Sequence, residues 1–168
     1  MKRTMTAILA ASFIMSGAAF ADEPVTIAPI SFGEELMEKA DEYGERELTR
    51  LARYMERQLD NRLDGLEMAD GTLLEVTIVD ADPNRPTMEQ MRDTPGLSMR
   101  SISLGGAELE AVLVGADGEI LERFEYSRRS HNINDVIGAS TWSDARRTMQ
   151  GFARQIGEAV TERSATGS

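Results

Sequence analysis

The sequence predicts an α+β fold: a two-layer sandwich in which a mainly antiparallel sheet of about five strands carries a long N-terminal helix and a C-terminal helix on one face. Three observations lead to this prediction. Several short segments alternate apolar and polar residues, as half-buried strands do. Two longer segments repeat apolar residues every three or four positions, which is typical of amphipathic helices. The strands gather between the helices instead of alternating with them, which favours α+β over α/β.

The first elements are a short strand and a long helix. Val25–Ile30 is rich in β-branched residues and is closed by Pro29. The helical pattern then runs from Glu34 to about Leu63, and Gly44 predicts a bend or a break in it. A helix between two strands lets the first strand lie parallel to the second. The apolar positions of the predicted buried face are Leu48, Leu51, Ala52, Met55, Leu59 and Leu63.

The second strand leads into an unusually long connection. In Thr72–Asp80, Leu74, Val76 and Ile78 alternate with polar residues, which predicts a strand with one buried face. Residues 82–97 follow with three prolines, and the sequence from Thr87 to Gln90 matches a capping box that predicts a short helix. Connections of this length are functional more often than short ones.

Three further strands are predicted as an antiparallel meander. Ser98–Leu104 is followed by Gly105–Gly106, which suits a hairpin turn. A strand with alternating Leu109, Ala111 and Leu113 comes next, and after a second turn signal the chain returns through Ile120–Ser127.

The last element is a helix that begins near Thr141 and ends near Arg163. Thr141–Asp144 resembles a second capping box. We expect one α+β domain over residues 22–163 and a disordered tail over residues 164–168, because the tail has no apolar residues to pack. The apolar stripe of this helix consists of Trp142, Ala145, Met149, Phe152, Ile156 and Val160.

Residues 1–21 have the pattern of a bacterial secretory signal peptide. Lys2 and Arg3 precede the apolar run Met5–Phe20, and the sequence Ala-Phe-Ala that ends at Ala21 matches a cleavage site. The run is shorter than a membrane-spanning helix requires, and no cysteine follows it for lipid attachment. The sequence therefore predicts a protein of the periplasm or the medium that is cleaved after Ala21 and is not stably inserted in a membrane.

Composition excludes several functions. The chain has 29 acidic and 18 basic residues and a net charge of −11, which is unfavourable for binding nucleic acid or anionic lipid. It has no cysteine, so disulfides, thiolate metal sites and cysteine nucleophiles are excluded, and packing must supply its stability.

Arginines on the long helix form one candidate binding site. Arg46, Arg50, Arg53 and Arg57 share a narrow sector opposite the apolar face. One interpretation is a solvated face with salt bridges, such as one between Glu42 and Arg46. The other is a basic docking strip for an acidic partner or for a second copy of the chain. A looser cluster near the last loop, with the same two interpretations, consists of Arg128, Arg129, Arg146 and Arg147.

A second candidate site is the run Asp80-x-Asp82-x-Asn84, whose oxygen ligands resemble the start of a calcium loop. The resemblance ends there, because Arg85 stands where glycine should turn the loop and Met91 stands where glutamate should close it. We therefore assign no metal or cofactor, and the run with its following loop remains a candidate site for a small ligand or a divalent cation.

The chain contains a single histidine, His131, and any hydrolase of the serine–histidine type must use it. Ser130 and Asp135 are near it in sequence, but no Gly-x-Ser-x-Gly motif is present and no pair of carboxylates stands out. No catalytic residue is assigned.

The passage from helix to strand resembles a group of small exported proteobacterial proteins of unknown function. The residues that carry the resemblance are Leu59–Leu63, the strand Thr72–Asp82 with its pattern Leu-x-Val-x-Ile-x-Asp-x-Asp, and the hairpin strands that end at Phe124–Tyr126. The resemblance covers about residues 25–127, whereas this chain continues into a further helix. It implies an envelope location and transfers no activity.

These observations together predict an exported envelope protein that acts as a non-enzymatic binding or adaptor module, with an envelope protein or a second copy as its partner. Two alternatives remain open. One is a small hydrolase that uses His131 and carboxylates. The other is a carrier of a small ligand or divalent cation that uses Asp80, Asp82 and residues 83–97.

Overall fold

The computed structural model describes residues 22–69 and 71–166. The predicted signal peptide, residues 1–21, lies outside the described residues. No helix among those described is both long enough and apolar enough to cross a membrane.

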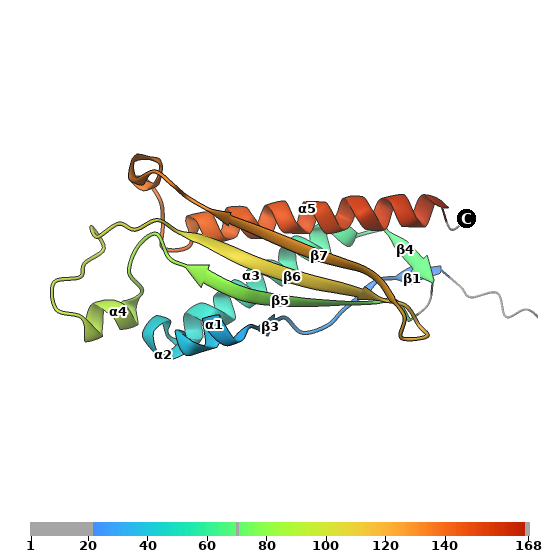
Figure 1. Ribbon diagram of the computed structural model, residues 1–168, viewed down its shortest axis with the longest axis horizontal. Coiled ribbons are helices and arrows are strands. Elements are labelled where there is room, and N and C mark those ends of the chain that lie inside the picture. The colour runs from blue at the N-terminus through green and yellow to red at the C-terminus, as the bar shows by residue number, and fades with distance from the viewer. Residues whose placement is uncertain (1–21, 70, 167–168) are drawn as a thin grey trace, which may run out of the picture.

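The fold is α+β, as predicted, with one mixed sheet of five strands (Figure 1). The central strand β5 (Leu73–Asp82) pairs antiparallel with β6 (Gly106–Val114), which pairs antiparallel with β7 (Ile120–Arg129). On its other side, β5 pairs in parallel with β2 (Thr26–Ile27) and β3 (Ser31–Phe32). The expected parallel pairing of the first strand is thus confirmed, but only Thr26–Ile27 of the predicted Val25–Ile30 form a strand, and β3 begins after its predicted end.

A separate two-stranded ribbon joins the start of the described chain to the end of the long helix. In it, β1 (Asp22–Pro24) pairs antiparallel with β4 (Glu67–Ala69). The sequence analysis did not predict this ribbon.

The predicted long helix is divided near Gly44. It consists of α1 (Glu34–Glu38), α2 (Ala40–Tyr43) and α3 (Glu45–Leu63). Gly44 has a φ of 89°, a backbone conformation that residues other than glycine rarely adopt. A Cβ at this position would also lie 2.6 Å from the side chain of Glu89. The chain therefore turns at this glycine, and only α3 continues as a long helix.

The last helix, α5 (Ser143–Thr166), lies beside α3 on one face of the sheet (Figure 1). The predicted apolar stripes of both helices face the sheet, and the core lies between the two layers. The largest fully buried side chains are Trp142, Phe152, Leu36, Leu51, Met55, Leu59, Leu74, Ile78, Leu109, Leu113, Met149 and Ile156.

The capping predictions had two outcomes. Helix α4 (Met88–Asp93) begins with the predicted box, in which the Thr87 hydroxyl accepts from the Gln90 N–H and the Gln90 side chain accepts from the Thr87 N–H. The box predicted at the start of α5 was wrong. There the N–H of Asp144 donates to Asn84 Oδ1 at 2.9 Å, so a residue from the long connection caps the helix.

The predicted strand Ser98–Leu104 was also wrong, because this segment is a loop. Its alternating side chains Ile102 and Leu104 are 37% and 44% exposed, so they lie at the surface and not on a sheet. The backbone bonds to another loop, since the Ser103 N–H donates to Asn84 O at 3.0 Å.

The adjacent glycines Gly105 and Gly106 allow close packing of the backbone and do not form the predicted hairpin turn. A Cβ on Gly105 would lie 2.6 Å from Asn84 Nδ2, and one on Gly106 would lie 2.5 Å from the Arg128 carbonyl oxygen. The glycine pair therefore lets the loop and the start of β6 pass close to their neighbours.

The last helix extends beyond its predicted end near Arg163, into the segment predicted to be a disordered tail. Helix α5 continues through residues 164–166, and the Ser164 hydroxyl donates to the carbonyl oxygens of Val160 and Glu67. These bonds extend the helix and tie it to β4, which explains the correction. Residues 167–168 lie outside the described part of the chain.

Candidate functional site

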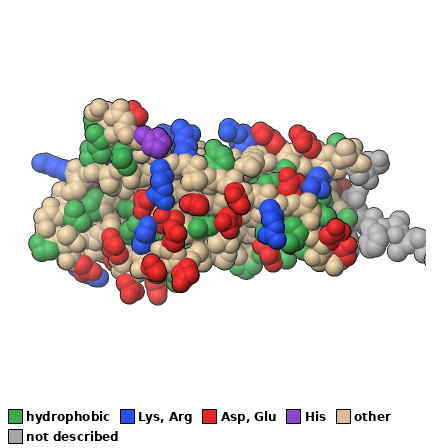
Figure 2. All heavy atoms as spheres, in the orientation of Figure 1, with side chains coloured by type: hydrophobic (Ala, Val, Ile, Leu, Met, Phe, Trp, Pro, Cys, Tyr) green, Lys and Arg blue, Asp and Glu red, His purple; other side chains and the backbone are tan. Residues whose placement is uncertain are grey.

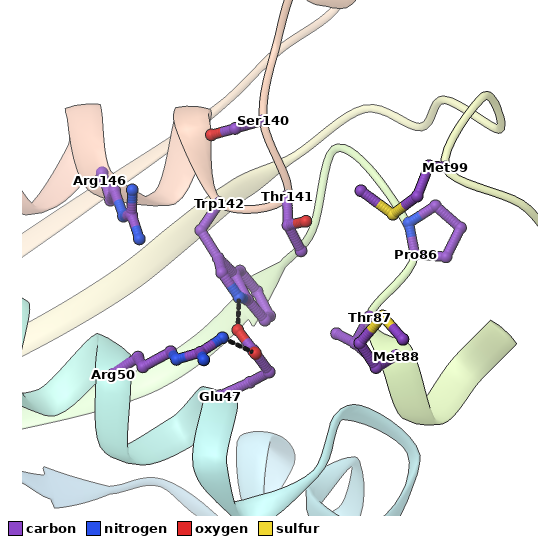
Figure 3. A pocket seen from close by; sticks show the side chains of 10 residues that line it. All are labelled: Glu47, Arg50, Pro86, Thr87, Met88, Met99, Ser140, Thr141, Trp142 and Arg146. Carbon is purple, nitrogen blue, oxygen red and sulfur yellow. Dashed lines mark hydrogen bonds and ion pairs between the residues drawn. The ribbon is translucent and has the colours of Figure 1, made fainter. Parts of the chain in front are cut away.

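A pocket of about 290 Å³ lies at one end of the helical layer, beside Trp142 (Figure 3). Three parts of the chain form it: the first turns of α3, the connection between β5 and β6, and the start of α5. Its lining residues are Glu47, Arg50, Pro86, Thr87, Met88, Met99, Ser140, Thr141, Trp142 and Arg146.

Asn84 joins two walls of this pocket. Its N–H donates to the Thr141 carbonyl oxygen at 2.7 Å, and its side-chain amide donates to Asp144 Oδ2 at 2.6 Å. The amide oxygen accepts from the Asp144 N–H, and the residue is fully buried. A buried amide with its donors and acceptor bonded fixes the position of its neighbours. Asn84 therefore holds the long connection against the start of α5.

Arg85 joins the outer loops in the same way. Its guanidinium donates to three carbonyl oxygens: those of Ala139, Met99 and Ile137 at 2.5, 2.6 and 2.6 Å. A single planar side chain thus ties residues 137–139 to the loop that carries Met99. The long connection predicted to be functional forms a wall of the pocket.

The buried carboxylate of Glu47 lines the pocket and bonds to two of its other residues. Glu47 Oε2 accepts from the Trp142 indole N–H at 2.9 Å, and Glu47 Oε1 accepts from Arg50. The Trp142 and Tyr43 rings form a T-shaped contact, with centroids 5.5 Å apart and planes at 79°. Trp142 is 2% exposed, so these contacts hold it in one orientation.

Arg146 is the unusual member of the lining. Its Nε is buried and has no hydrogen-bond partner, and it is the only such side-chain atom among the described residues. The guanidinium carbon lies 5.3 Å from the centre of the Tyr54 ring, over which Arg57 also lies, at 5.7 Å. Arg146 on α5 therefore lies next to the arginines of α3.

The pocket has a cationic side and an apolar side. In Figure 3, Arg50 and Arg146 lie to one side of the Trp142 ring, and Met88, Met99 and Pro86 lie to the other. Such a lining suits a group that is anionic at one end and aliphatic at the other. We found no reacting pair of nucleophile and base among these residues.

The predicted arginine strip lies along the exposed side of α3. Arg50 forms an ion pair with Glu47, but Arg46, Arg53 and Arg57 form none within the described chain. The proposed pair of Glu42 with Arg46 was wrong. Glu42 lies in α2, beyond the turn at Gly44, and its carboxylate accepts from Gln90 at 2.6 Å.

Asp80 and Asp82 lie in an ionic cluster at the end of β5. Lys39 Nζ lies 2.7 Å from Asp80 Oδ1 and 3.1 Å from Asp82 Oδ1, and Arg129 donates to the other oxygen of each carboxylate. Tyr43 also donates to Asp82, at 3.3 Å. We call Lys39, Asp80, Asp82 and Arg129 the ionic cluster.

The environment shifts two pKa values in this region. Burial disfavours the charged form of Asp80, but hydrogen bonds from Lys39 and Arg129 outweigh it and hold the pKa below its ordinary value of 3.8. Burial, followed by the nearby charges of Glu42 and Asp80, raises the pKa of Tyr43 to about 12. Tyr43 therefore remains a hydrogen-bond donor at neutral pH.

The structure separates the three residues of the candidate cation site. Asp80 and Asp82 point to the same two cations, whereas Asn84 points to Asp144. Among the residues that the structure describes, no group of three or more histidine, cysteine or acidic side chains is placed to hold a metal ion.

His131 lies in an exposed hollow of about 630 Å³ that Arg128, Arg129 and Arg147 also line. The Ser130 hydroxyl donates to Asp144 Oδ2 at 2.6 Å and not to His131. Within the described residues the structure does not bring His131, Ser130 and Asp135 into one hydrogen-bonded chain.

Sequence reasoning missed several residues of the pocket. It placed Trp142 in the core but not its bond to Glu47, and it passed over Met88 and Met99. One signal was available: Glu47 precedes Leu51 by four residues, so a carboxylate stands on the buried face of α3. Arg85 was noted only as a departure from a calcium loop.

No family model matches the chain, and no curated protein matches it. Among solved structures, the chain is similar to the crystal structure of a "putative lipoprotein" from Caulobacter crescentus, a proteobacterium. The two share 15% identity over 84% of this chain and 92% of that chain, with a TM-score of 0.41. A likeness at this level carries no argument about function, so the geometry of the site must supply it.

Proposed function

We propose that this is an exported, non-enzymatic binding module that docks an acidic protein partner on the arginines of its helical layer. The docking surface, called the arginine surface below, consists of Arg46, Arg50, Arg53 and Arg57 of α3 and Arg146 of α5. The two helices meet here around Tyr54, whose ring contacts Arg57 and Arg146. The surface is therefore continuous.

One observation carries the proposal. Four of these five arginines form no ion pair with any described residue, in a chain with 29 acidic and 18 basic residues. With so many carboxylates available, a purely solvating arginine face would be expected to contain salt bridges. Unpaired guanidinium groups are instead available for the carboxylates of another protein.

The opposite face of the molecule supports the same partner. The outward face of the sheet carries exposed Glu75, Glu110 and Glu125, and the last two lie opposite each other on β6 and β7. Figure 2 shows this face, where many acidic side chains lie over the strands with Lys and Arg side chains among them. An acidic partner is repelled there and attracted to the helices, so electrostatics selects one face.

A labelled peptide of alternating glutamate and serine tests the proposal by fluorescence anisotropy. We expect it to bind the wild-type protein at low salt and to dissociate as salt is raised, because exposed charges are screened beyond about 10 Å at 0.1 M. Arg46→Glu/Arg53→Glu should weaken binding by about tenfold or more. Both side chains are exposed, so the fold should be retained.

The matched control is Arg92→Glu/Arg123→Glu, which changes the net charge equally at exposed positions of α4 and β7, outside this surface. It should change the affinity by about twofold at most, through the net charge alone. Equal affinities of the two double variants would overturn the proposal. A third outcome is that the wild type binds no peptide but dimerises, and that Arg46→Glu/Arg53→Glu abolishes the dimer. The partner would then be a second copy of the chain.

A further inference from the structure

We infer that the pocket beside Trp142 anchors one carboxylate of the acidic partner together with the aliphatic side chain next to it. This inference rests on the proposed function and specifies the partner's chemistry: an acidic residue adjacent to a leucine-like residue, or a C-terminal carboxylate on such a residue. Four features of the pocket support it.

The first feature is the unsatisfied cation. A buried N–H without an acceptor is costly, and the Nε of Arg146 is in this state. Because this nitrogen is closed to solvent, a partner reaches the side chain through the terminal nitrogens of the guanidinium, which lines the pocket and forms no ion pair with a described residue. A carboxylate of a partner would therefore supply the counter-ion that the described chain does not.

The second feature is that the pocket stays cationic although it contains Glu47. Both oxygens of Glu47 accept hydrogen bonds, one from the Trp142 indole and one from Arg50. Glu47 thus positions the ring and one guanidinium. With two arginines and one glutamate, the lining keeps a net positive charge.

The third feature is the apolar side. Met88 and Met99 are 68% and 52% exposed, although both are large and apolar. Methionine side chains adapt to differently shaped aliphatic groups. They lie across the indole from Arg50 and Arg146 (Figure 3), so the carboxylate and the aliphatic group of the occupant must be neighbours.

The fourth feature is rigidity and size. Asn84 and Arg85 tie the walls together through buried and multiple hydrogen bonds, so little further ordering is needed on binding. The volume of about 290 Å³ lies at the small end for ligand pockets. It suits one or two side chains of a longer partner whose remaining charges lie on the arginine surface.

Trp142 makes the inference directly measurable, because it is the only tryptophan in the chain. The reference probe is the glutamate–serine peptide of the previous section. The second probe has leucine in place of the serine beside its central glutamate. We expect the second probe to shift the Trp142 emission and to bind about fivefold more tightly, because its leucine becomes buried.

Two further probes identify the source of the carboxylate. In one, glutamine replaces the central glutamate of the leucine-containing peptide, and the shift should be lost. In the other, the same glutamine peptide ends in leucine with a free C-terminal carboxylate. A shift restored by this probe shows that a chain terminus is accepted, and no restoration assigns the pocket to an internal acidic residue.

Variants of the pocket complete the test. Arg146→Gln should lower the affinity for the leucine-containing probe by about tenfold, because the carboxylate loses its charged donor. Met88→Ser, at an exposed position, should weaken it by about threefold and leave the fold intact. The matched control is Arg154→Gln, also on α5 but outside the pocket, which should have no effect.

Failure of the inference can be distinguished from failure of the proposed function. If Arg46→Glu/Arg53→Glu weakens binding of every peptide while Trp142 emission stays fixed and Met88→Ser binds the leucine-containing probe normally, the pocket is not the anchor and the arginine surface still is. If the wild type binds none of the peptides, both proposals are overturned.

Discussion

The ionic cluster and the arginine surface use the same kind of cation in opposite ways. In the cluster, Arg129 and Lys39 contact both Asp80 and Asp82, so that each cation has two carboxylate partners. On the surface, Arg46 and Arg53 contact no carboxylate of the described chain. Tyr43 donates to Asp82 and packs on Trp142, which bonds to Glu47, the ion-pair partner of Arg50; this chain of contacts joins the two regions.

The comparison teaches that pairing, not residue type, separates the structural charges from those available for binding. Charges that are partnered within the chain hold elements together: Lys39, between α1 and α2, and Arg129 of β7 both contact the carboxylates at the end of β5. Charges without partners contribute little to stability and remain free for another molecule. The predictions that follow remove or protonate groups in each region.

The largest effect should come from Asp80→Ala. This carboxylate is 4% exposed, and its loss leaves Lys39 and Arg129 with Asp82 alone. Breaking a buried ion pair is strongly destabilising, so we expect a loss of about 3 kcal/mol in the free energy of unfolding, measured with urea. Glu110→Ala, at an exposed position, is the control and should change it by less than about 0.5 kcal/mol. Equal losses would show that the cluster is not structural.

Asn84→Ala should come next, at about 2 kcal/mol, because it leaves the carboxylate and N–H of Asp144 without this partner. It should also loosen the pocket walls, and the Trp142 emission of the free protein should shift as water gains access to the indole. An unchanged spectrum together with unchanged stability would show that Asn84 does not hold the walls.

Acid should weaken the ionic cluster but not the arginine surface. The pKa of Asp80 is lower in the folded chain than its ordinary value of 3.8, so the unfolded state binds the proton more readily. Its contribution to stability is complete above about pH 5 and is lost as pH falls through the folded pKa. Urea unfolding between pH 6 and pH 3 should show a steeper loss for the wild type than for Asp80→Asn, and parallel curves would contradict this.

The smallest effect on stability should come from Arg46→Ala and Arg53→Ala. Neither guanidinium has an ion pair to lose, so each variant should unfold within about 0.5 kcal/mol of the wild type. Each should nevertheless weaken the glutamate–serine peptide. A loss of stability larger than 1.5 kcal/mol, roughly a tenfold change in the folding equilibrium, would show that these arginines are structural.

The sequence was sufficient for elements whose pattern is local. The alternation in β5, the apolar stripes of α3 and α5, the break at Gly44 and the capping box at Thr87 were all predicted. Each depends on residues within a few positions of one another, and the structure confirms each.

The predictions that were wrong depended on distant residues. Residues 98–104 have a strand pattern, but the Ser103 N–H, which could have bonded to a strand, donates to the Asn84 carbonyl oxygen, and the Ser103 hydroxyl donates to that of Pro83. For the same reason the pocket was not predicted. Its key contacts join Glu47 to Trp142 and Asn84 to Asp144, and no local periodicity indicates such pairs.

These two contacts also determine when the site can exist. They span 95 and 60 residues, and both end at the start of α5, the last element of the chain. Contacts of such sequence separation close late in folding, since the intervening chain must first be ordered. A chain that is still being synthesised, or one shortened before α5, has the arginines of α3 but no pocket. Recognition through Trp142 would thus be restricted to molecules whose synthesis and folding are complete.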